Sequence, residues 1–107
     1  MQGYNEIEAN ELFDMMANEK LLLVDVRNDD EVARGMISGA QHLPLAMVPV
    51  KFESLNSDQA LVFYCHSGIR SAQAAAFVAS KGRRQVFNLR GGVLAWGKAG
   101  YSFQPKG

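Results

Sequence analysis

The most informative pattern along the chain is a set of short apolar runs separated by polar and glycine-containing segments. The runs KLLLVDVR at residues 20–27 and ALVFY at residues 60–64 are almost continuously apolar. Runs of this kind are typical of strands that are buried on both faces of a sheet. QVFNL at residues 85–89 predicts another strand, and residues 40–43 predict a short one after a glycine-containing loop.

Apolar residues at helical spacing lie between these runs. Residues 9–18 have the amphipathic pattern of a helix. Residues 45–56 also have helical spacing, but Pro49 limits them to one or two short helical turns.

Two further helical segments follow later in the chain. The alanine-rich residues 71–82 predict a helix with Ser71 as its N-cap and Gly82 as its C-terminal stop. Residues 90–100 predict a glycine turn and a short helix, and we expect the tail from Ser102 to be loose.

Strands that alternate with helices predict an α/β fold with about five mainly parallel strands and helices on both faces. The 107 residues suffice for one domain, residues 1–107, with its core at about residues 7–103. Ligands of such sheets bind beyond the carboxyl ends of the strands. Cys65 follows directly after the strand predicted at residues 60–64 and therefore lies at such an end.

The charge balance narrows the range of partners. Eleven basic residues balance eleven acidic ones, so the chain lacks the basic excess expected of a protein that binds nucleic acid or a membrane surface. No apolar run approaches the ~20 residues needed to cross a bilayer. The polar start MQGYNEIEANEL has no signal-peptide pattern, and we expect a cytoplasmic protein.

Cys65 is the only cysteine of the chain. It cannot form an intramolecular disulfide, and the two histidines, His42 and His66, add too few ligands for a structural zinc site. Cys65 is therefore either a small buried hydrophobic residue or a reactive thiol. We expect no metal and no cofactor.

The segment after Cys65 has the composition of an anion-binding loop. A helix N-terminus favours negative charge and can lower the pKa of a cysteine. If residues 66–71 curl around the sulfur, several backbone N–H groups point inward, and Gly68 allows the positive φ that such a curl requires. Arg70 adds a guanidinium suited to an oxyanion.

Three segments of the chain together carry a resemblance to a known family: LLVDVRNDDEVARGMISGAQHLP, VFYCHSGIRSAQAA and LRGGVLAW. In this order they resemble the first signature, the active-site loop and the closing signature of the single-domain rhodaneses, which are sulfurtransferases. The matching positions outside the loop are Asp25, Arg27, Glu31, Gly35, Ile37, Gly39, Ala40, Pro44, Gly91, Gly92 and Trp96. Met36 stands where the family usually has a histidine, which we interpret as structural.

The resemblance implies a mechanism. The Cys65 thiolate would attack the outer sulfur of a small anionic donor, thiosulfate or a related persulfide, and become a persulfide itself. The amides of residues 66–71 would hold the persulfide, and Arg70 would orient the donor and the leaving sulfite. Cyanide, a small thiol or a protein thiol would then accept the sulfur, with ping-pong kinetics.

Two other functions remain open at this stage. Cysteine phosphatases on the same fold use a Cys-x5-Arg loop, whereas Cys65 and Arg70 form the shorter Cys-x4-Arg spacing. Rhodanese-like domains can also act as docking modules, or as carriers that pass persulfide sulfur from one protein to another.

The residues around the predicted pocket have more modest expected roles. His66, Ser67 and Ile69 shape its rim, and Ser71 caps the helix, bonds the persulfide, or does both.

Outside the loop, we interpret Asp25, Arg27 and Glu31 as structural support, with Arg27 paired to one of the two carboxylates. Arg90 follows another strand end, where it could add positive potential.

Overall fold

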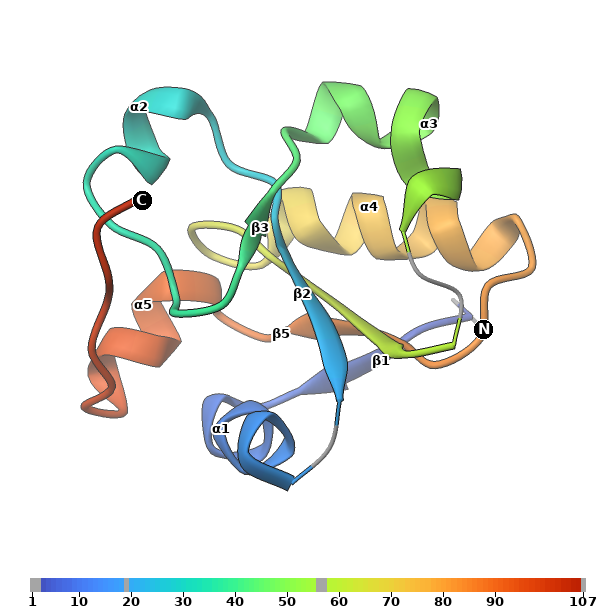
Figure 1. Ribbon diagram of the computed structural model, residues 1–107. Helices are drawn as coiled ribbons and strands as arrows, with labels where there is room; N and C mark the ends of the chain where they lie inside the picture. Colours follow the sequence, from blue (N-terminus) through green and yellow to red (C-terminus); the bar gives the residue numbers. More distant parts are fainter. Residues whose placement is uncertain (1–2, 19, 56–57, 107) are drawn as a thin grey trace.

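The computed structural model describes residues 3–18, 20–55 and 58–106 of the chain. Its sheet has five strands in the order β1-β5-β4-β2-β3, and every pairing between neighbours is parallel (Figure 1). In chain order the strands are β1 (Asn5–Ile7), β2 (Leu21–Asp25), β3 (Gln41–His42), β4 (Ala60–Tyr64) and β5 (Val86–Leu89).

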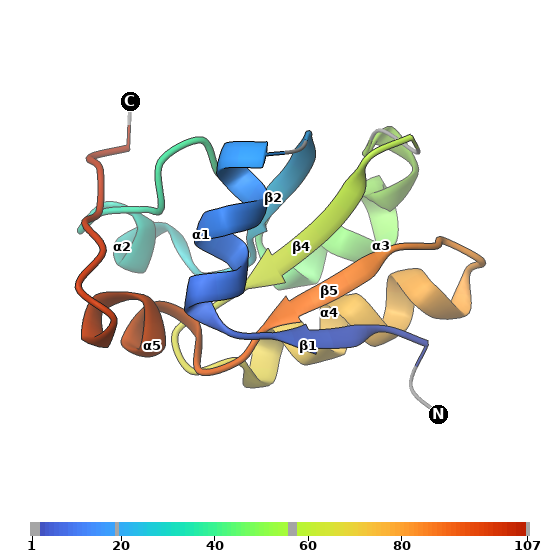
Figure 2. The same cartoon turned by 90° about the horizontal axis from the view of Figure 1, so that it is seen from below.

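Helices cover both faces of this sheet. They are α1 (Ala9–Asn18), α2 (Asp29–Val32), α3 (Val48–Lys51), α4 (Ile69–Ser80) and α5 (Gly92–Lys98). The 3₁₀ turns Leu45–Met47 and Phe52–Ser54 flank α3. Figures 1 and 2 show α3 and α4 on one face of the sheet and α1 and α5 on the other.

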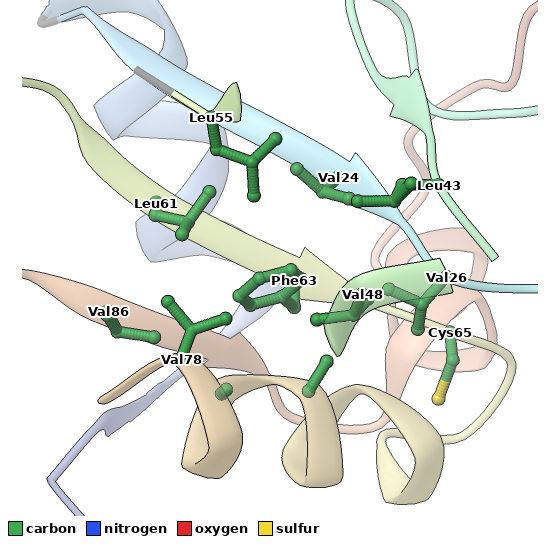
Figure 3. Close-up of a cluster of buried hydrophobic side chains, with 12 residues drawn as sticks. Val24, Val26, Leu43, Val48, Leu55, Leu61, Phe63, Cys65, Val78 and Val86 are labelled. Atoms are coloured by element: carbon green, nitrogen blue, oxygen red, sulfur yellow. The ribbon is translucent and has the colours of Figure 1, made fainter. Parts of the chain in front are cut away.

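The sheet separates the core into two layers, and its central strand β4 contributes side chains to both. All five of its residues are buried, and successive side chains point to opposite faces. Leu61 and Phe63 join the cluster under α3 and α4, whereas Val62 and Tyr64 join the cluster under α1 and α5. Cys65 continues the first series, so its side chain enters the layer next to α4 (Figure 3).

The structure confirms the α/β class, the parallel sheet and most of the expected elements. Two elements had not been located from the sequence. Strand β1 is a short edge strand of mixed polarity, and α2 has only four residues, so neither carries an apolar period long enough to detect. The short strand expected at residues 40–43 is confined to Gln41–His42.

The predicted start of α4 was wrong by three residues. The helix begins at Ile69, and its N-cap is Gly68 with φ +100°, not Ser71. A left-handed residue at this place suits glycine, because it lacks a Cβ. Ser71 therefore lies inside the first turn, where its side chain can point toward the strand end.

The tail is also better fixed than expected. Met36 and Gln104 form an isolated antiparallel bridge, and each donates its amide to the other's carbonyl oxygen at 2.7 Å. The indole Nε1 of buried Trp96 donates to the Ser102 carbonyl oxygen at 3.0 Å. These bonds hold the tail across the end of the sheet that carries Cys65.

Candidate active site

The thiol of Cys65 lies inside a ring of hydrogen-bond donors. The Gly68 amide is 3.1 Å from Sγ, the Ser71 amide 3.4 Å and the Ser71 hydroxyl oxygen 3.3 Å. Both serine donors come from the first turn of α4, where backbone N–H groups have no partner within the helix. The sulfur is thus held at the positive end of a 12-residue helix.

These donors change the acidity of the thiol. Burial by itself raises the pKa of Cys65, which is only 1% exposed. The Ser71 hydroxyl and the amides of Ser71, Gly68 and Ser67 outweigh burial, so the pKa of the thiol lies below its ordinary value. The local geometry therefore favours a thiolate.

The glycine turn at the start of α5 supports the backbone that carries these donors. The amides of Val93 and Leu94, at the start of α5, donate to the carbonyl oxygens of Cys65 and His66 at 2.9 and 3.2 Å. A Cβ on Gly92 would collide with both of these carbonyl groups. The glycine turn therefore allows α5 to approach the backbone of the sulfur loop (residues 66–71), a role that the sequence had not indicated.

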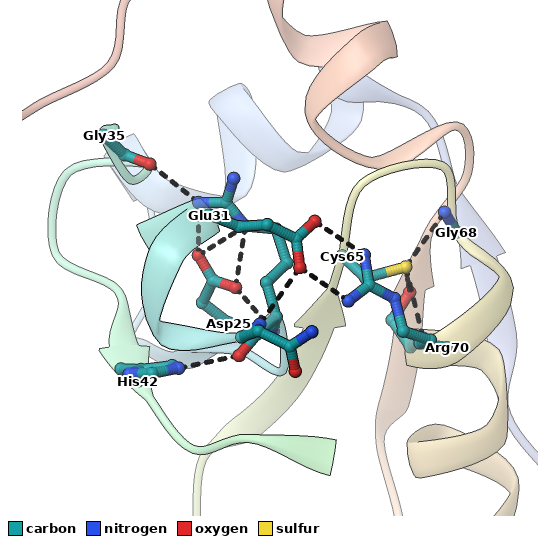
Figure 4. A network of polar contacts seen from close by, with 10 residues as sticks. Asp25, Glu31, Gly35, His42, Cys65, Gly68 and Arg70 are labelled. Atoms are coloured by element: carbon teal, nitrogen blue, oxygen red, sulfur yellow. Dashed lines mark hydrogen bonds and ion pairs between the residues drawn. The ribbon is translucent and has the colours of Figure 1, made fainter. Parts of the chain in front are cut away.

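Arg70 does not point freely toward a ligand. Its Nη1 and Nη2 donate to Oε1 and Oε2 of Glu31 at 2.7 and 2.8 Å (Figure 4). Glu31 also accepts the Asn28 amide at 3.1 Å in the capping box of α2. The hydrogen bond from Arg70 is the largest cause that lowers the pKa of Glu31 to about 2.

Arg27 forms its ion pair with Asp25 and not with Glu31. Its Nε and Nη2 donate to both oxygens of fully buried Asp25 at 2.8–3.1 Å, and Nη2 also reaches the Gly35 carbonyl oxygen at 2.7 Å. Asp25 pairs in register with Tyr64, whose hydroxyl accepts the Ile37 amide at 3.0 Å. This network ties the ends of β2 and β4 to the loop before β3.

Of the other residues expected near the pocket, two line it, one is exposed in the loop beside it, and Arg90 lies outside its lining. His66 and Ser67 are exposed and line a pocket beside the sulfur loop, and the Ile69 side chain is 70% exposed. Arg90 lies outside this pocket lining and donates to Glu8 at 2.7 Å. The structure thus gives Arg90 a partner on the edge of the molecule near β1.

The pocket beside the sulfur loop has a volume of about 450 Å³. Sequence reasoning had not found four of its lining residues, because they come from three separate segments. The lining consists of Arg27, Glu31, Arg34, Gly35, His66, Ser67, Arg70, Val93 and Phe103. Cys65 is not among these residues and is only 1% exposed, so the loop residues separate its sulfur from solvent.

The matching family model is the rhodanese-like domain, over residues 8–99. The chain belongs to the rhodanese-like family. A sulfurtransferase of Allochromatium vinosum is 42% identical over 97 residues, 90% of this chain and 91% of that protein. The putative sulfurtransferase YtwF of Bacillus subtilis is 44% identical over 80 residues, 75% and 77% of the two chains.

A solved structure agrees with this family. The rhodanese-like domain protein of Staphylococcus aureus has a TM-score of 0.84 and 31% identity, over 96% of this chain and 99% of that one. The chain is thus a member of the rhodanese-like sulfurtransferases in both sequence and fold.

Metal binding and membrane insertion are two other classes of function. Within residues 3–18, 20–55 and 58–106, no three His, Cys, Asp or Glu side chains come together in a group that could bind a metal ion. No helix in this part of the chain has the length and apolar character needed to cross a membrane.

Proposed function

We propose that this rhodanese-like protein moves sulfane sulfur from thiosulfate or a related persulfide donor to cyanide or a thiol, through a persulfide on Cys65. The observation that carries the proposal is the set of donors around the Cys65 sulfur. The same amides and the Ser71 hydroxyl that favour a thiolate would also hold the terminal sulfur of a persulfide anion.

In the first half-reaction, the Cys65 thiolate attacks the outer sulfur of the donor. A new S–S bond forms on Cys65, the donor's bond to that sulfur breaks, and the donor leaves with the electron pair, as sulfite when thiosulfate is used. In the second half-reaction, cyanide or a thiolate attacks the terminal sulfur and returns Cys65 to its thiolate. Two sequential covalent steps predict ping-pong kinetics.

We assign Arg70 to the orientation of the anionic donor. Its guanidinium lines the pocket, but Glu31 engages both terminal nitrogens, so a donor anion would share or displace that carboxylate. A more distant relative supports thiosulfate as donor: the thiosulfate sulfurtransferase GlpE of Coxiella burnetii is 27% identical over 93 residues.

A protein partner as donor or acceptor is the second candidate function. Ile69 belongs to the loop 66–71, and Leu94 of α5 bonds the His66 carbonyl oxygen through its amide; the two residues are 70% and 55% exposed. Apolar side chains at this position favour a carrier that exchanges sulfur with another protein. A phosphatase is disfavoured because the Cys-x4-Arg loop directs its donors at one sulfur atom and leaves little room for a tetrahedral phosphate.

Intact mass spectrometry tests the proposal directly. The reduced protein and a Cys65→Ser variant are incubated with thiosulfate and then with cyanide. We expect the wild type alone to gain the mass of one sulfur atom and to lose it to cyanide as thiocyanate. If thiosulfate fails but a protein persulfide loads Cys65, the carrier function is favoured; if no donor loads Cys65, the sulfurtransferase proposal is wrong. The cytoplasmic location stays a prediction from the sequence.

A further inference from the structure

The pocket beside Cys65 is larger than an inorganic donor requires. Sites that hold organic ligands have volumes of about 300–1,000 Å³, and this pocket, at about 450 Å³, falls within that range. Thiosulfate would occupy only the part next to the sulfur loop. The wall formed by Arg34, Gly35 and Phe103, which lies outside both the loop 66–71 and α5, would remain without a function.

The three guanidinium groups that line the pocket differ in whether a carboxylate already binds them. Arg27 is bound to Asp25 and Arg70 to Glu31, each through two or more hydrogen bonds. Arg34 is exposed, and no carboxylate of the described residues lies within ion-pair distance of it. Arg34 is therefore the guanidinium of this lining whose charge no described carboxylate offsets.

The apolar part of the same wall is held in place by the tail. The Met36–Gln104 bridge fixes the chain on either side of this wall. A Cβ on Gly97 would lie 3.5 Å from the Phe103 ring, so the ring packs on α5 where a side chain is missing. Phe103 nevertheless keeps 39% of its surface exposed and lines the pocket.

We infer that Arg34 and Phe103 form a subsite for the body of an organic persulfide donor that carries a carboxylate. The carboxylate would bind the guanidinium of Arg34, and the carbon chain would lie on the Phe103 ring. This inference rests on the proposed function, because the subsite serves a donor whose outer sulfur is delivered to Cys65.

The transfer from such a donor balances without any further reactant. The Cys65 thiolate attacks the outer sulfur of R–S–SH and forms the new S–S bond. The S–S bond of the donor breaks, and the R–S⁻ thiolate leaves with the electron pair. The proton of the donor passes to water or to the departing thiolate, and no net oxidation occurs.

Binding to the subsite can be measured apart from sulfur transfer. The probe is S-methylglutathione, an unreactive thioether with two carboxylates, titrated calorimetrically into the Cys65→Ser protein. We expect Arg34→Gln in that background to raise Kd about five- to tenfold and Arg34→Lys to recover most of the loss. Unchanged binding in Arg34→Gln, or no binding to the Cys65→Ser protein itself, would overturn the inference.

The matched control changes the same charge elsewhere. Arg84 is exposed and lines a separate hollow of about 540 Å³ beyond the C-terminus of α4. The 12 residues of α4 span about 18 Å, so this hollow is remote from Cys65. Arg84→Gln is expected to bind the probe like its parent, and a loss equal to that of Arg34→Gln would show only a general charge effect and overturn the subsite.

Turnover separates the two proposals. In the chain with Cys65 intact, Arg34→Gln should lower kcat/KM for glutathione persulfide about five- to tenfold and for its diethyl ester less than about twofold. Equal losses with both donors would refute recognition of the carboxylate. If no donor loads Cys65 while S-methylglutathione still binds through Arg34, the proposed function fails and the role of the subsite in sulfur delivery fails with it, although the binding of a carboxylate by Arg34 is established.

Discussion

Replacement of Ser71 by alanine tests whether the hydrogen bonds around the sulfur set its acidity. The Ser71 hydroxyl donates to Sγ at 3.3 Å from a side chain with no exposed surface. Ser71→Ala removes this donor but keeps both backbone amides. A hydrogen bond to a charged group contributes about 1.5–3 kcal/mol, and we take the lower end because sulfur is a diffuse acceptor.

Loss of this hydrogen-bond energy should raise the pKa of the Cys65 thiol. One pKa unit corresponds to about 1.4 kcal/mol, so the pKa of Cys65 should rise by about one unit in Ser71→Ala. Below both pKa values, the thiolate fraction then falls about tenfold. The rate of alkylation by iodoacetamide, measured against pH, reports the pKa and the thiolate fraction together.

Ser67→Ala is the matched control, because it also removes a loop hydroxyl but keeps the amide that acts on the sulfur. It should leave the pKa of Cys65 unchanged. An alkylation profile of Ser71→Ala that coincides with the wild type would refute the assignment of acidity to the hydroxyl.

Stability should follow the same titration. The pKa of Cys65 is depressed in the folded protein, so the stabilisation from its thiolate is fully present above the unfolded pKa. It is lost as the pH falls through the folded pKa. The stability difference between wild type and Ser71→Ala should therefore grow with pH across this window, as measured by urea denaturation.

Three further substitutions test the support around the site. Glu31→Gln should lower the free energy of unfolding by about 1 kcal/mol near neutral pH, because it weakens the pair with Arg70. The pKa of Glu31 is lowered to about 2, so this difference, measured by urea denaturation, should be fully present above the unfolded pKa of Glu31 and should disappear as the pH falls toward 2. Gly92→Ala should destabilise the fold by about 1–3 kcal/mol or more, since its Cβ meets the carbonyl groups of the sulfur loop, and a melting temperature equal to the wild type would contradict this contact. Tyr64→Phe should cost about 1–3 kcal/mol because the buried Ile37 amide loses its acceptor, and hydrogen exchange of that amide should accelerate; unchanged exchange would argue against the bond.

The framework of the fold could be predicted because it depends on local patterns. Strands β2, β4 and β5 are apolar runs, and α4 is an alanine-rich segment ended by Gly82. The position of Cys65 at a strand end follows from the same reading. These features need no knowledge of which segments meet in space.

The finer features of the site depend on contacts between distant segments. Arg70 and Glu31 are 39 residues apart, so the sequence could not show which carboxylate the guanidinium would bind. The contact of Gly92 with the sulfur loop and the contribution of Phe103 to the pocket also join segments that are far apart in the chain. The true start of α4 was missed because Ser71 fits the usual residue preference for an N-cap, whereas a glycine occupies that position.

The Met36–Gln104 bridge has a practical consequence for how the protein is handled. Because Phe103 lines the pocket and Gln104 is bonded to Met36, an affinity tag at the C-terminal end would be joined only a few residues along the chain from the pocket wall. Proteolytic trimming of a few C-terminal residues would remove Phe103 or loosen it while leaving every strand and helix in place. Preparations that differ only in this region should therefore differ in substrate preference, so a tag at the other terminus is the safer choice for kinetic work.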